Sequence, residues 1–254
     1  MRSLTSILYC RKVDVVNIKS KVSSNWHLQF AIFFLLLLSL FFPPAVSAQT
    51  YDPWREANQR IYAFNDYFDQ LLVRPLASSY TFFMPRVVRQ GIGNFFSNVR
   101  DANIAANNLL QFKFQDALSD TGRFLINTTI GVGGLIDIAT SFSLEKHEED
   151  FGQTFGAWGM SSGPYVVLPV FCASNLRDSF GLILDTMFNP LPYIDSTPAK
   201  ITFFVVEEID SRSGLLALDE LISGDKYLFV REAYVQNREY LVIDGEIEDE
   251  FGSF

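Results

Sequence analysis

Cysteine, histidine and basic residues are all scarce in this 254-residue chain. It has two cysteines, Cys10 and Cys172, and two histidines, so it offers neither a disulfide framework nor the paired ligands of a zinc site. Lys and Arg number 20 against 29 Asp and Glu, which gives a formal net charge of −9. A nucleic-acid interface needs clustered basic residues, so we expect no nucleic acid among the partners.

Long apolar runs are also few. The run FAIFFLLLLSLFF (30–42) is shorter than the ~20 residues that a membrane-spanning helix needs. It follows a basic stretch and precedes the small-residue site Val46-Ser47-Ala48, which is the order of an export signal. We expect residues 1–48 to be a signal peptide cleaved after Ala48; the alternative is an uncleaved anchor. The mature chain would then keep one thiol, Cys172, as a small buried apolar residue or, alternatively, a reactive group.

Phenylalanine is the residue type in excess, with 25 copies among aromatic residues that make up 15% of the chain. Each buried Phe contributes roughly 1.5–3 kcal/mol. So many indicate either an aromatic-rich core or surfaces that contact something apolar, and composition leaves both readings open.

The mature chain is predicted to be mostly helical. Asp52-Pro53 is a start signal, with a capping carboxylate before a proline in the first turn. An apolar stripe at spacings of three and four follows, and Pro75 is expected to end this helix. Further helical patterns are expected after Pro85 and over 104–112, 117–126, 174–188 with a Ser174 cap, 197–221, and 225–241.

Glycine breaks the pattern in TTIGVGGLIDIA (128–139). Three glycines within four positions do not suit a helix interior, so we expect a bend or hairpin between apolar arms. GVGG lacks the third glycine of a dinucleotide loop and the G-K-[ST] ending of a phosphate loop. Residues 141–163 are expected to be irregular and 164–170 extended. The acidic residues from 244 onward are expected to form a disordered tail.

Two sites that suggest catalysis or metal binding fail on closer reading. GMSSG around Ser161 fits the nucleophile-elbow pattern, but glycines and prolines disfavour the required strand and helix around it. The single mature histidine, His147, precedes Ser161, so the order of a hydrolase triad is wrong as well. The acidic stretch around His147 (145–150) is expected to be a solvated loop; weak divalent-ion binding is the alternative. The sequence therefore predicts that the protein is not an enzyme and needs no cofactor or metal.

Several long stretches, in a fixed order, resemble one known family. They are YDPWREANQRIYAFNDYFD (51–69), RPLASSY (74–80), NLLQ (108–111), RFLINTTIGVGGLIDIA (123–139), EDFGQTFGAWGMSSGPYVVLP (149–169), RDS (177–179), Asp195-Ser196 and KYLFVREAYVQNREYLV (226–242). The set resembles the MlaA (VacJ) family of outer-membrane phospholipid-transport proteins over about residues 51–245.

The resemblance implies a mostly α, single ring-like helical domain (49–243) of amphipathic helices, with a glycine-bend hairpin and no large sheet. Such a protein would sit on the periplasmic side of the outer membrane as a passive conduit. It would remove misplaced outer-leaflet phospholipid and pass it to a periplasmic carrier protein, with an outer-membrane porin trimer as partner. Phe64 and Asn65 would match the family's first amphipathic helix, and Gly131, Gly133 and Gly134 its gating bend. Plain packing and a structural turn remain open as alternatives.

One departure from the family pattern affects membrane attachment. Family members usually carry a lipidated cysteine directly after the signal, and here no cysteine lies between Phe42 and Cys172. A soluble periplasmic lipid-binding protein is therefore the alternative to a membrane conduit. A lipid hydrolase that uses Ser161 is a third hypothesis.

Overall fold

The computed structural model describes residues 52–170, 172–220, 222 and 224–245. Chain contacts divide the sequence into two units, Met1–Pro44 and Ala45–Phe254, and every described residue belongs to the second. The expected signal peptide with its cleavage site at Ala48 lies outside the described residues. So do residues 246–254 of the expected tail and the side chain of Cys172.

The second unit is mostly helical with one two-stranded sheet, which confirms the expected fold class. The elements are α2 (Arg55–Phe68), η2 (Asp69–Val73), α3 (Arg74–Phe83), α4 (Arg86–Leu110), α5 (Phe114–Thr129), η3 (Ala139–Phe142), α6 (Phe151–Ala157), β1 (Tyr165–Leu168), β2 (Cys172–Asn175), α7 (Leu176–Phe188), η4 (Leu191–Tyr193), α8 (Thr197–Leu215), η5 (Leu216–Glu220) and α9 (Lys226–Val242).

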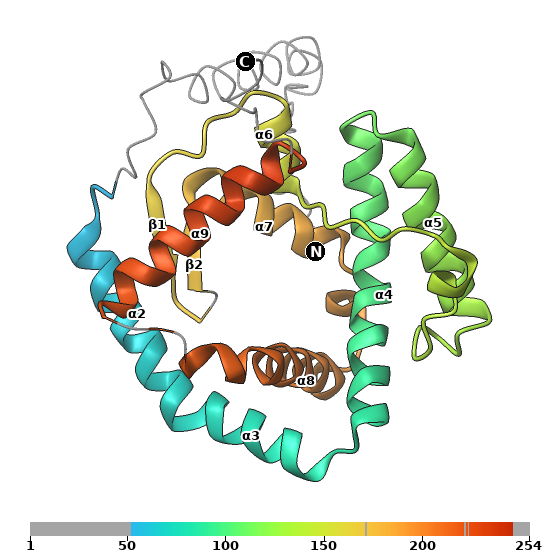
Figure 1. The fold of residues 1–254 in the computed structure, drawn as a ribbon, viewed down its shortest axis with the longest axis horizontal. Coiled ribbons are helices and arrows are strands. Elements are labelled where there is room, and N and C mark those ends of the chain that lie inside the picture. Colours follow the sequence, from blue (N-terminus) through green and yellow to red (C-terminus); the bar gives the residue numbers. More distant parts are fainter. Residues whose placement is uncertain (1–51, 171, 221, 223, 246–254) are drawn as a thin grey trace, which may run out of the picture. The chain divides into compact units, whose positions relative to one another are not determined.

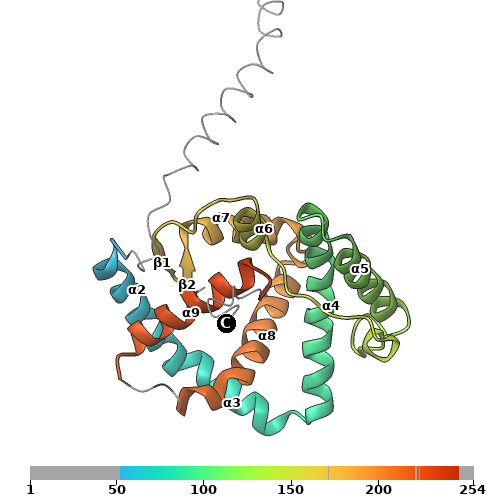
Figure 2. The same ribbon diagram turned by 45° about the horizontal axis from the view of Figure 1, so that its top comes forward.

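These elements close a ring within the second unit (Figure 1). α2, η2 and α3 run on from one another, α3 packs against α8, and α8 packs against α4. α4 contacts α6 and α7, α7 contacts β2, and β1 returns to α2. α5 packs on α4 at the outer side of the circuit, and α9 lies across β2 and α6 (Figure 2).

Side-chain caps fix where four of the helices begin. Asp150 accepts from the Gln153 amide at 2.8 Å to start α6, and Asp225 caps α9, which begins one residue after the predicted start at 225. Ser196 caps α8. The predicted Ser174 cap is wrong by one residue, because the Asn175 side chain caps α7 while Ser174 lies in β2. An Asn cap satisfies the same free amide groups at a helix start as a Ser does.

Asp52 was expected to cap the first helix, and that prediction is wrong. Helix α2 begins at Arg55, and its N-cap residue, Trp54, makes no side-chain capping bond. The Asp52 carboxylate instead accepts hydrogen bonds from Asn58 at 2.8 Å and from Tyr227. It therefore ties the start of the described chain to α9, a long-range contact that local spacing cannot reveal.

Two predicted helix boundaries are also wrong. Pro75 does not end a helix: it lies in the first turn of α3, directly after the π-helical turn η2, and the chain stays helical from α2 through η2 into α3. The two patterns expected after Pro85 and over 104–112 form a single helix, α4, of 25 residues. Residues 141–163, expected to be irregular, contain the whole of α6.

The extended segment predicted over 164–170 is confirmed for 165–168, whereas 169 and 170 form a turn, and the partner strand was missed. β1 pairs antiparallel with β2, with Tyr165 opposite Asn175 and Leu168 opposite Cys172. The other edge of β1 is satisfied by two asparagines of α2. Asn58 donates to Tyr165 O at 3.0 Å and accepts from Val167 N at 2.9 Å.

Asn65, two helical turns further along α2, repeats this pattern at the turn after β1. It donates to Leu168 O and accepts from Val170 N, both at 2.9 Å. Side-chain amides thus stand in for a third strand, because an amide presents the same donor and acceptor as a peptide group. The hydrophobic cluster of Tyr165, Val167 and Tyr227 lies beside this contact.

Candidate functional site

Helix α5 is amphipathic in the reverse sense to a helix of a water-soluble protein. Its buried face carries Asp120, Arg123 and Asn127, each at most 3% exposed. Its solvent-facing stripe carries Phe114, Leu118 and Leu125, which are 64%, 74% and 54% exposed. Spacings of four and seven place these three on one side of the helix. An apolar stripe turned outward is favourable only where it contacts something apolar.

The described residues as a whole repeat this inversion. Fifteen polar or charged side chains are buried among them, against ten hydrophobic ones. Large apolar side chains are exposed on most elements around the ring. They include Phe64, Tyr67, Leu71, Phe82, Phe83, Val87, Phe112, Phe114, Leu118, Ile130, Val132, Phe142, Ile183, Met187, Phe188 and Ile201. Of the two readings of the phenylalanine excess, exposed apolar surface is therefore the one observed.

Charged pairs hold α5 to α4 and to the loop that follows it. Arg123 donates to Asp137 at 2.8 Å and to Leu144 O at 2.8 Å. Burial opposes ionisation of Asp137, but hydrogen bonds from Thr140 and Arg123 outweigh it and lower the pKa of this carboxyl to about 2. The charges of Arg123 and Asp137 therefore compensate each other.

The predicted glycine bend lies directly after α5. Gly133 and Gly134 adopt φ of +69° and +90°, which L-residues rarely tolerate. A Cβ on Gly131 would lie 2.2 Å from Ile136 O, so this position has no room for a side chain. Asn127 closes the bend from below by accepting from the amides of Ile138 and Ala139 at 2.8 and 2.9 Å. No strand forms here, so the bend is a helix-to-loop turn with exposed apolar residues at its tip.

The predicted site residues fall into two separate groups. Phe64 is 55% exposed on α2 and stacks on Phe68 with ring centroids 6.4 Å apart. The amide of Asn65 is used by the β1 turn described above. Helix α2 and the α5 bend lie on opposite sides of the ring in both views (Figures 1 and 2). The structure therefore brings Gly131, Gly133 and Gly134 together, but not with Phe64 and Asn65.

The acidic stretch before α6 is a loop, as expected, but it is only partly solvated: Glu145 and Glu148 are exposed, whereas Glu149 is not. Glu149 is 9% exposed and accepts from Lys113 and Gln111, both at 2.7 Å. Burial raises the pKa of Glu149, and these two donors oppose the rise. His147 contacts Asp120 through Nδ1 at 2.9 Å. Among the described residues, no group of three or more Cys, His, Asp or Glu side chains is placed to hold a metal ion.

Ser161 lies in an exposed loop between α6 and β1. The residues before it form a short helix and those after it a strand, which is the reverse of the strand-to-helix order of a nucleophile elbow.

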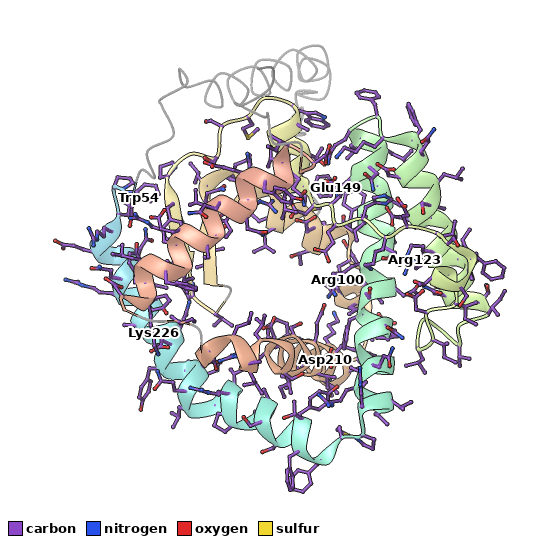
Figure 3. The ribbon with its side chains drawn as sticks, in the orientation of Figure 1. Trp54, Arg100, Arg123, Glu149, Asp210 and Lys226 are labelled. Atoms are coloured by element: carbon purple, nitrogen blue, oxygen red, sulfur yellow. The ribbon has the colours of Figure 1, made fainter. Side chains whose placement is uncertain are left out.

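Charged side chains also bridge the inner side of the ring. Arg100 points from α4 toward the centre in Figure 3 and donates to Glu207 of α8 at 2.8 Å. In the contact between α3 and α8, Tyr80 of α3 donates to Asp210 of α8 at 2.7 Å. Polar groups therefore join α8 to both of its neighbours.

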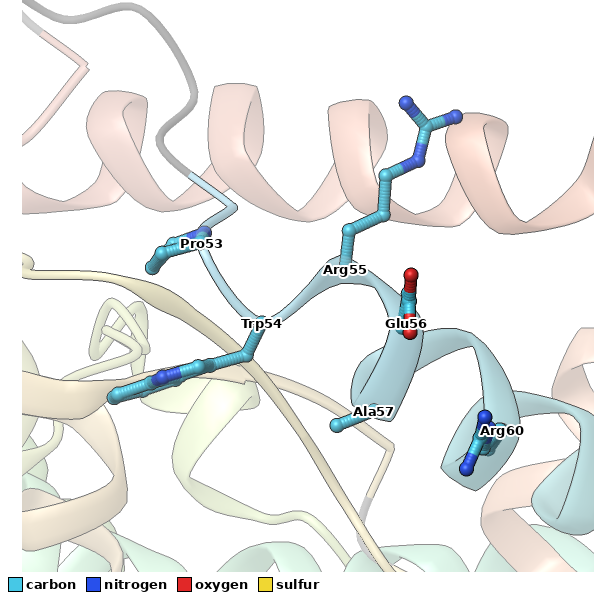
Figure 4. A pocket seen from close by; sticks show the side chains of 6 residues that line it. All are labelled: Pro53, Trp54, Arg55, Glu56, Ala57 and Arg60. Carbon is cyan, nitrogen blue, oxygen red and sulfur yellow. The ribbon is translucent and has the colours of Figure 1, made fainter.

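A surface hollow of about 410 Å³ lies at the start of α2 (Figure 4). It is lined by Pro53, Trp54, Arg55, Glu56, Ala57 and Arg60. An exposed indole beside two guanidinium groups is the combination that favours a membrane–water boundary, where ring and charge can each find a suitable environment.

None of the helices in the described part of the chain is both long enough and apolar enough to cross a bilayer. The family description "MlaA lipoprotein" matches residues 50–241. The chain belongs to the MlaA family. Proteins of Shigella flexneri and Escherichia coli K12, both named intermembrane phospholipid transport system lipoprotein MlaA, are each 34% identical over 203 residues. That match covers 78% of this chain and 80% of each relative. An uncharacterised protein of Rickettsia typhi is 32% identical over 195 residues, covering 75% of this chain and 78% of its own.

A solved structure of the MlaA family is similar in fold as well as sequence. It is described as "Structural basis for maintenance of bacterial outer membrane lipid asymmetry" and matches with a TM-score of 0.68 at 34% identity. The match covers 75% of this chain and 98% of the other. The family resemblance and the ring-like helical fold are thus confirmed.

The residues that sequence reasoning missed are the buried polar ones, above all Asp120, Arg123 and Asn127. A signal was present: Asp120, Arg123 and Asn127 recur at spacings of three and four, as core residues do. Periodicity alone predicts that a polar stripe faces the solvent, because the apolar stripe of a helix is assumed to be the buried one.

Proposed function

We propose that this protein is a passive conduit for phospholipid in the outer membrane. It removes misplaced phospholipid from the outer leaflet and passes it to a periplasmic carrier, which maintains lipid asymmetry. The names of the MlaA relatives and the described subject of the solved structure support phospholipid transport and lipid asymmetry.

The observation that carries the membrane part of the proposal is the reversed helix α5. Leu118 is 74% exposed while Asp120, two residues later, is fully buried. In water this arrangement exposes apolar surface that burial would stabilise by about 25 cal/mol per Å². In a lipid leaflet the same stripe is solvated by acyl chains, and the polar face stays inside the protein. A ring with this polarity can lie within one leaflet without crossing the bilayer.

A ring is suited to lipid transfer for an energetic reason. The two tails of a phospholipid hold ~30 methylenes, and exposing them to water would cost on the order of 20 kcal/mol. The tails must therefore stay shielded along the whole path, while the headgroup passes along polar groups. The exposed apolar residues and the charges on the inner side of the ring supply these two environments in one small domain.

The chain carries no nucleotide-binding loop in its sequence, so we assign it no energy-supplying step. Direction would come from its partners, a porin trimer in the membrane and a soluble carrier in the periplasm. We also propose that it is not an enzyme. Ser161→Ala should leave outer-leaflet phospholipid at the wild-type level, whereas a rise would support the hydrolase alternative.

The glycine bend is the gate in this proposal. Its base is fixed by Asn127, while the apolar residues at its tip remain exposed. Proline cannot adopt the φ of +69° found at Gly133, so Gly133→Pro must rearrange the bend. Outer-leaflet phospholipid should then change at unchanged protein abundance. An unaltered leaflet composition would leave the bend a structural turn.

The first experiment expresses the full chain with its native signal, separates inner membrane, outer membrane and periplasm, and measures the intact mass of the product. We expect a mass that begins at Gln49, in the outer membrane, retained after a salt wash. The same mass in the periplasm would favour the soluble lipid-binding alternative. A mass that includes the first 48 residues would show an uncleaved anchor.

A further inference from the structure

A cavity of about 190 Å³ lies beside α9, lined by residues of β1, β2 and α7 and by Asp150 at the start of α6. Its charged and polar lining consists of Asp150, Ser174, Asp178, Asp185, Tyr234 and Arg238. At ~30 Å³ per water, this volume equals roughly six waters. Six of its nine lining residues are polar or charged, so the cavity suits a small polar group better than an acyl chain.

The two arginines at this cavity, Arg238 and Arg177, already pair with two of its aspartates. Arg238 donates through Nη1 to Asp150 at 2.6 Å and through Nε to Asp178 at 2.6 Å. Asp178 also accepts from Arg177 Nε at 2.9 Å and from the Tyr234 hydroxyl at 2.6 Å. These two aspartates are thus compensated by the two guanidinium groups that contact them.

Asp185 is the third carboxylate of the cavity, and neither arginine donates a hydrogen bond to it. Its Oδ1 accepts from Asn103 Nδ2 at 2.7 Å and from the Phe151 amide at 3.2 Å, both of which are neutral donors. Its Oδ2 has no hydrogen-bond partner, and the side chain makes no ion pair, among the described residues. Burial, assisted by the nearby charge of Asp150, raises the pKa of Asp185 to about 6, although the bonds from Asn103 and Phe151 and the nearby charge of Arg238 favour the ionised form. The fold holds this carboxylate at a cost that a bound cation would relieve.

An anion-binding group lies one helical turn away on α4. Arg100 precedes Asn103 by three residues, so the two share a helix face and differ by about 4.5 Å along the axis. The Arg100 side chain is 52% exposed and has one ion-pair partner, Glu207. Its guanidinium still offers free donors on the inner side of the ring (Figure 3).

We propose that the cavity beside α9 binds the ammonium group of a zwitterionic, amine-bearing phospholipid, with Asp185 as its anionic partner and Arg100 as a contact to the phosphate. The pairing matches one excess negative charge in the cavity to one positive charge on the headgroup. It also explains why an acid without a counter-ion is held beside Asn103. This inference rests on the proposed function and adds the headgroup class that the path would select.

The test measures which lipids the protein takes up. The purified full chain in detergent is incubated with vesicles of equal parts phosphatidylethanolamine and phosphatidylglycerol, recovered, and its bound lipids are quantified by mass spectrometry. We expect about tenfold enrichment of phosphatidylethanolamine, the effect of one hydrogen-bonded charge pair. Asp185→Asn, which keeps the shape and an acceptor for Asn103, should bring that ratio to one with total bound lipid unchanged.

Two further variants sharpen the result. Asp195→Asn makes the same chemical change at an exposed residue outside the cavity and should keep the wild-type ratio. Arg100→Gln should lower the uptake of both lipids alike, since both carry a phosphate. Unchanged uptake in Arg100→Gln would remove Arg100 from the site.

The failures of the two proposals are distinguishable. Wild-type protein that binds both lipids in vesicle proportions would overturn the headgroup inference and leave the conduit function intact. Enrichment of phosphatidylethanolamine that persists in Asp185→Asn would also overturn the headgroup inference and leave the conduit function intact. Wild-type protein that takes up no phospholipid would overturn the proposed function, and the headgroup inference with it.

Discussion

Arg238 of α9 donates hydrogen bonds through both of its terminal nitrogens to Asp150. The same Asp150 carboxylate caps the start of α6. The third donor of Arg238, Nε, bonds Asp178 of α7 at 2.6 Å. Burial would lower the pKa of Arg238, but its bonds to Asp150 and the charge of Asp178 raise the pKa overall. One side chain thus links three helices at the point where α9 crosses the ring.

Arg238→Ala should destabilise the protein by about 3–5 kcal/mol, because it removes the cation shared by buried Asp178 and by Asp150, the cap of α6. Thermal unfolding of the detergent-solubilised chain measures this. Arg60→Ala, at an exposed arginine of α2, is the control and should change stability by at most about 0.5 kcal/mol. Equal effects of the two substitutions would show that Arg238 is not a structural link.

Asn58→Ala and Asn65→Ala should each release one specific backbone amide. Asn58 accepts from Val167 N, and Asn65 accepts from Val170 N. Hydrogen exchange measured residue by residue should therefore speed up at Val167 in the first variant and at Val170 in the second. Asn58→Ala should also cost about 1–3 kcal/mol, since its partners are buried. Uniform acceleration in both variants would contradict separate roles.

Gly134→Ala should cost more stability than Gly159→Ala. Both glycines have nearly the same φ, +90° and +89°. A Cβ at 134 would lie 2.8 Å from Asn98 Cβ, whereas nothing lies within 4 Å of one at 159. Gly159→Ala therefore measures the left-handed strain alone, about 1–2 kcal/mol, and the excess in Gly134→Ala measures the contact with α4. Urea unfolding measures both losses. Equal losses of unfolding free energy in the two variants would mean that Asn98 moves aside without cost.

Asp185→Asn should stabilise the protein at neutral pH. The folded pKa of about 6 lies above the usual 3.8, so wild-type stability from this group is full below pH 3.8 and is lost as pH rises through 6. The variant has no such loss. The two should unfold alike near pH 3.5, and the variant should be about 1–3 kcal/mol more stable at pH 7. Parallel stability curves across this range would contradict the assigned pKa.

The double substitution Leu118→Glu and Leu125→Glu should move the protein from the membrane to the soluble fraction. Both side chains lie on the exposed stripe of α5, so charges there cost little in folding but oppose insertion into a leaflet. Gln115→Glu adds a charge at an exposed polar residue of the same helix and should leave membrane retention unchanged. Retention of the double variant would locate the membrane contact elsewhere.

Several local features of the chain could be predicted from the sequence, because short-range conformational preferences determine them. The helix start near 225, the extended residues 165–168 and the glycine bend after α5 all depend on the preferences of a few adjacent residues. Pro75 and Asp52 were misread for the opposite reason. Proline is tolerated in a first turn, and a carboxylate serves a distant tyrosine as readily as a nearby amide.

The sequence by itself determined the family, the helical class and the places where the backbone must bend, since these follow from ordered motifs and local conformational preference. Tertiary structure alone decided which face of each helix is buried. Periodicity shows that α5 has a polar and an apolar side, but only packing against α4 shows that Arg123 lies inside and Leu118 outside. It also decided that Asp185, one aspartate among many in the sequence, lies in the cavity beside α9 with hydrogen bonds from neutral donors alone among the described residues.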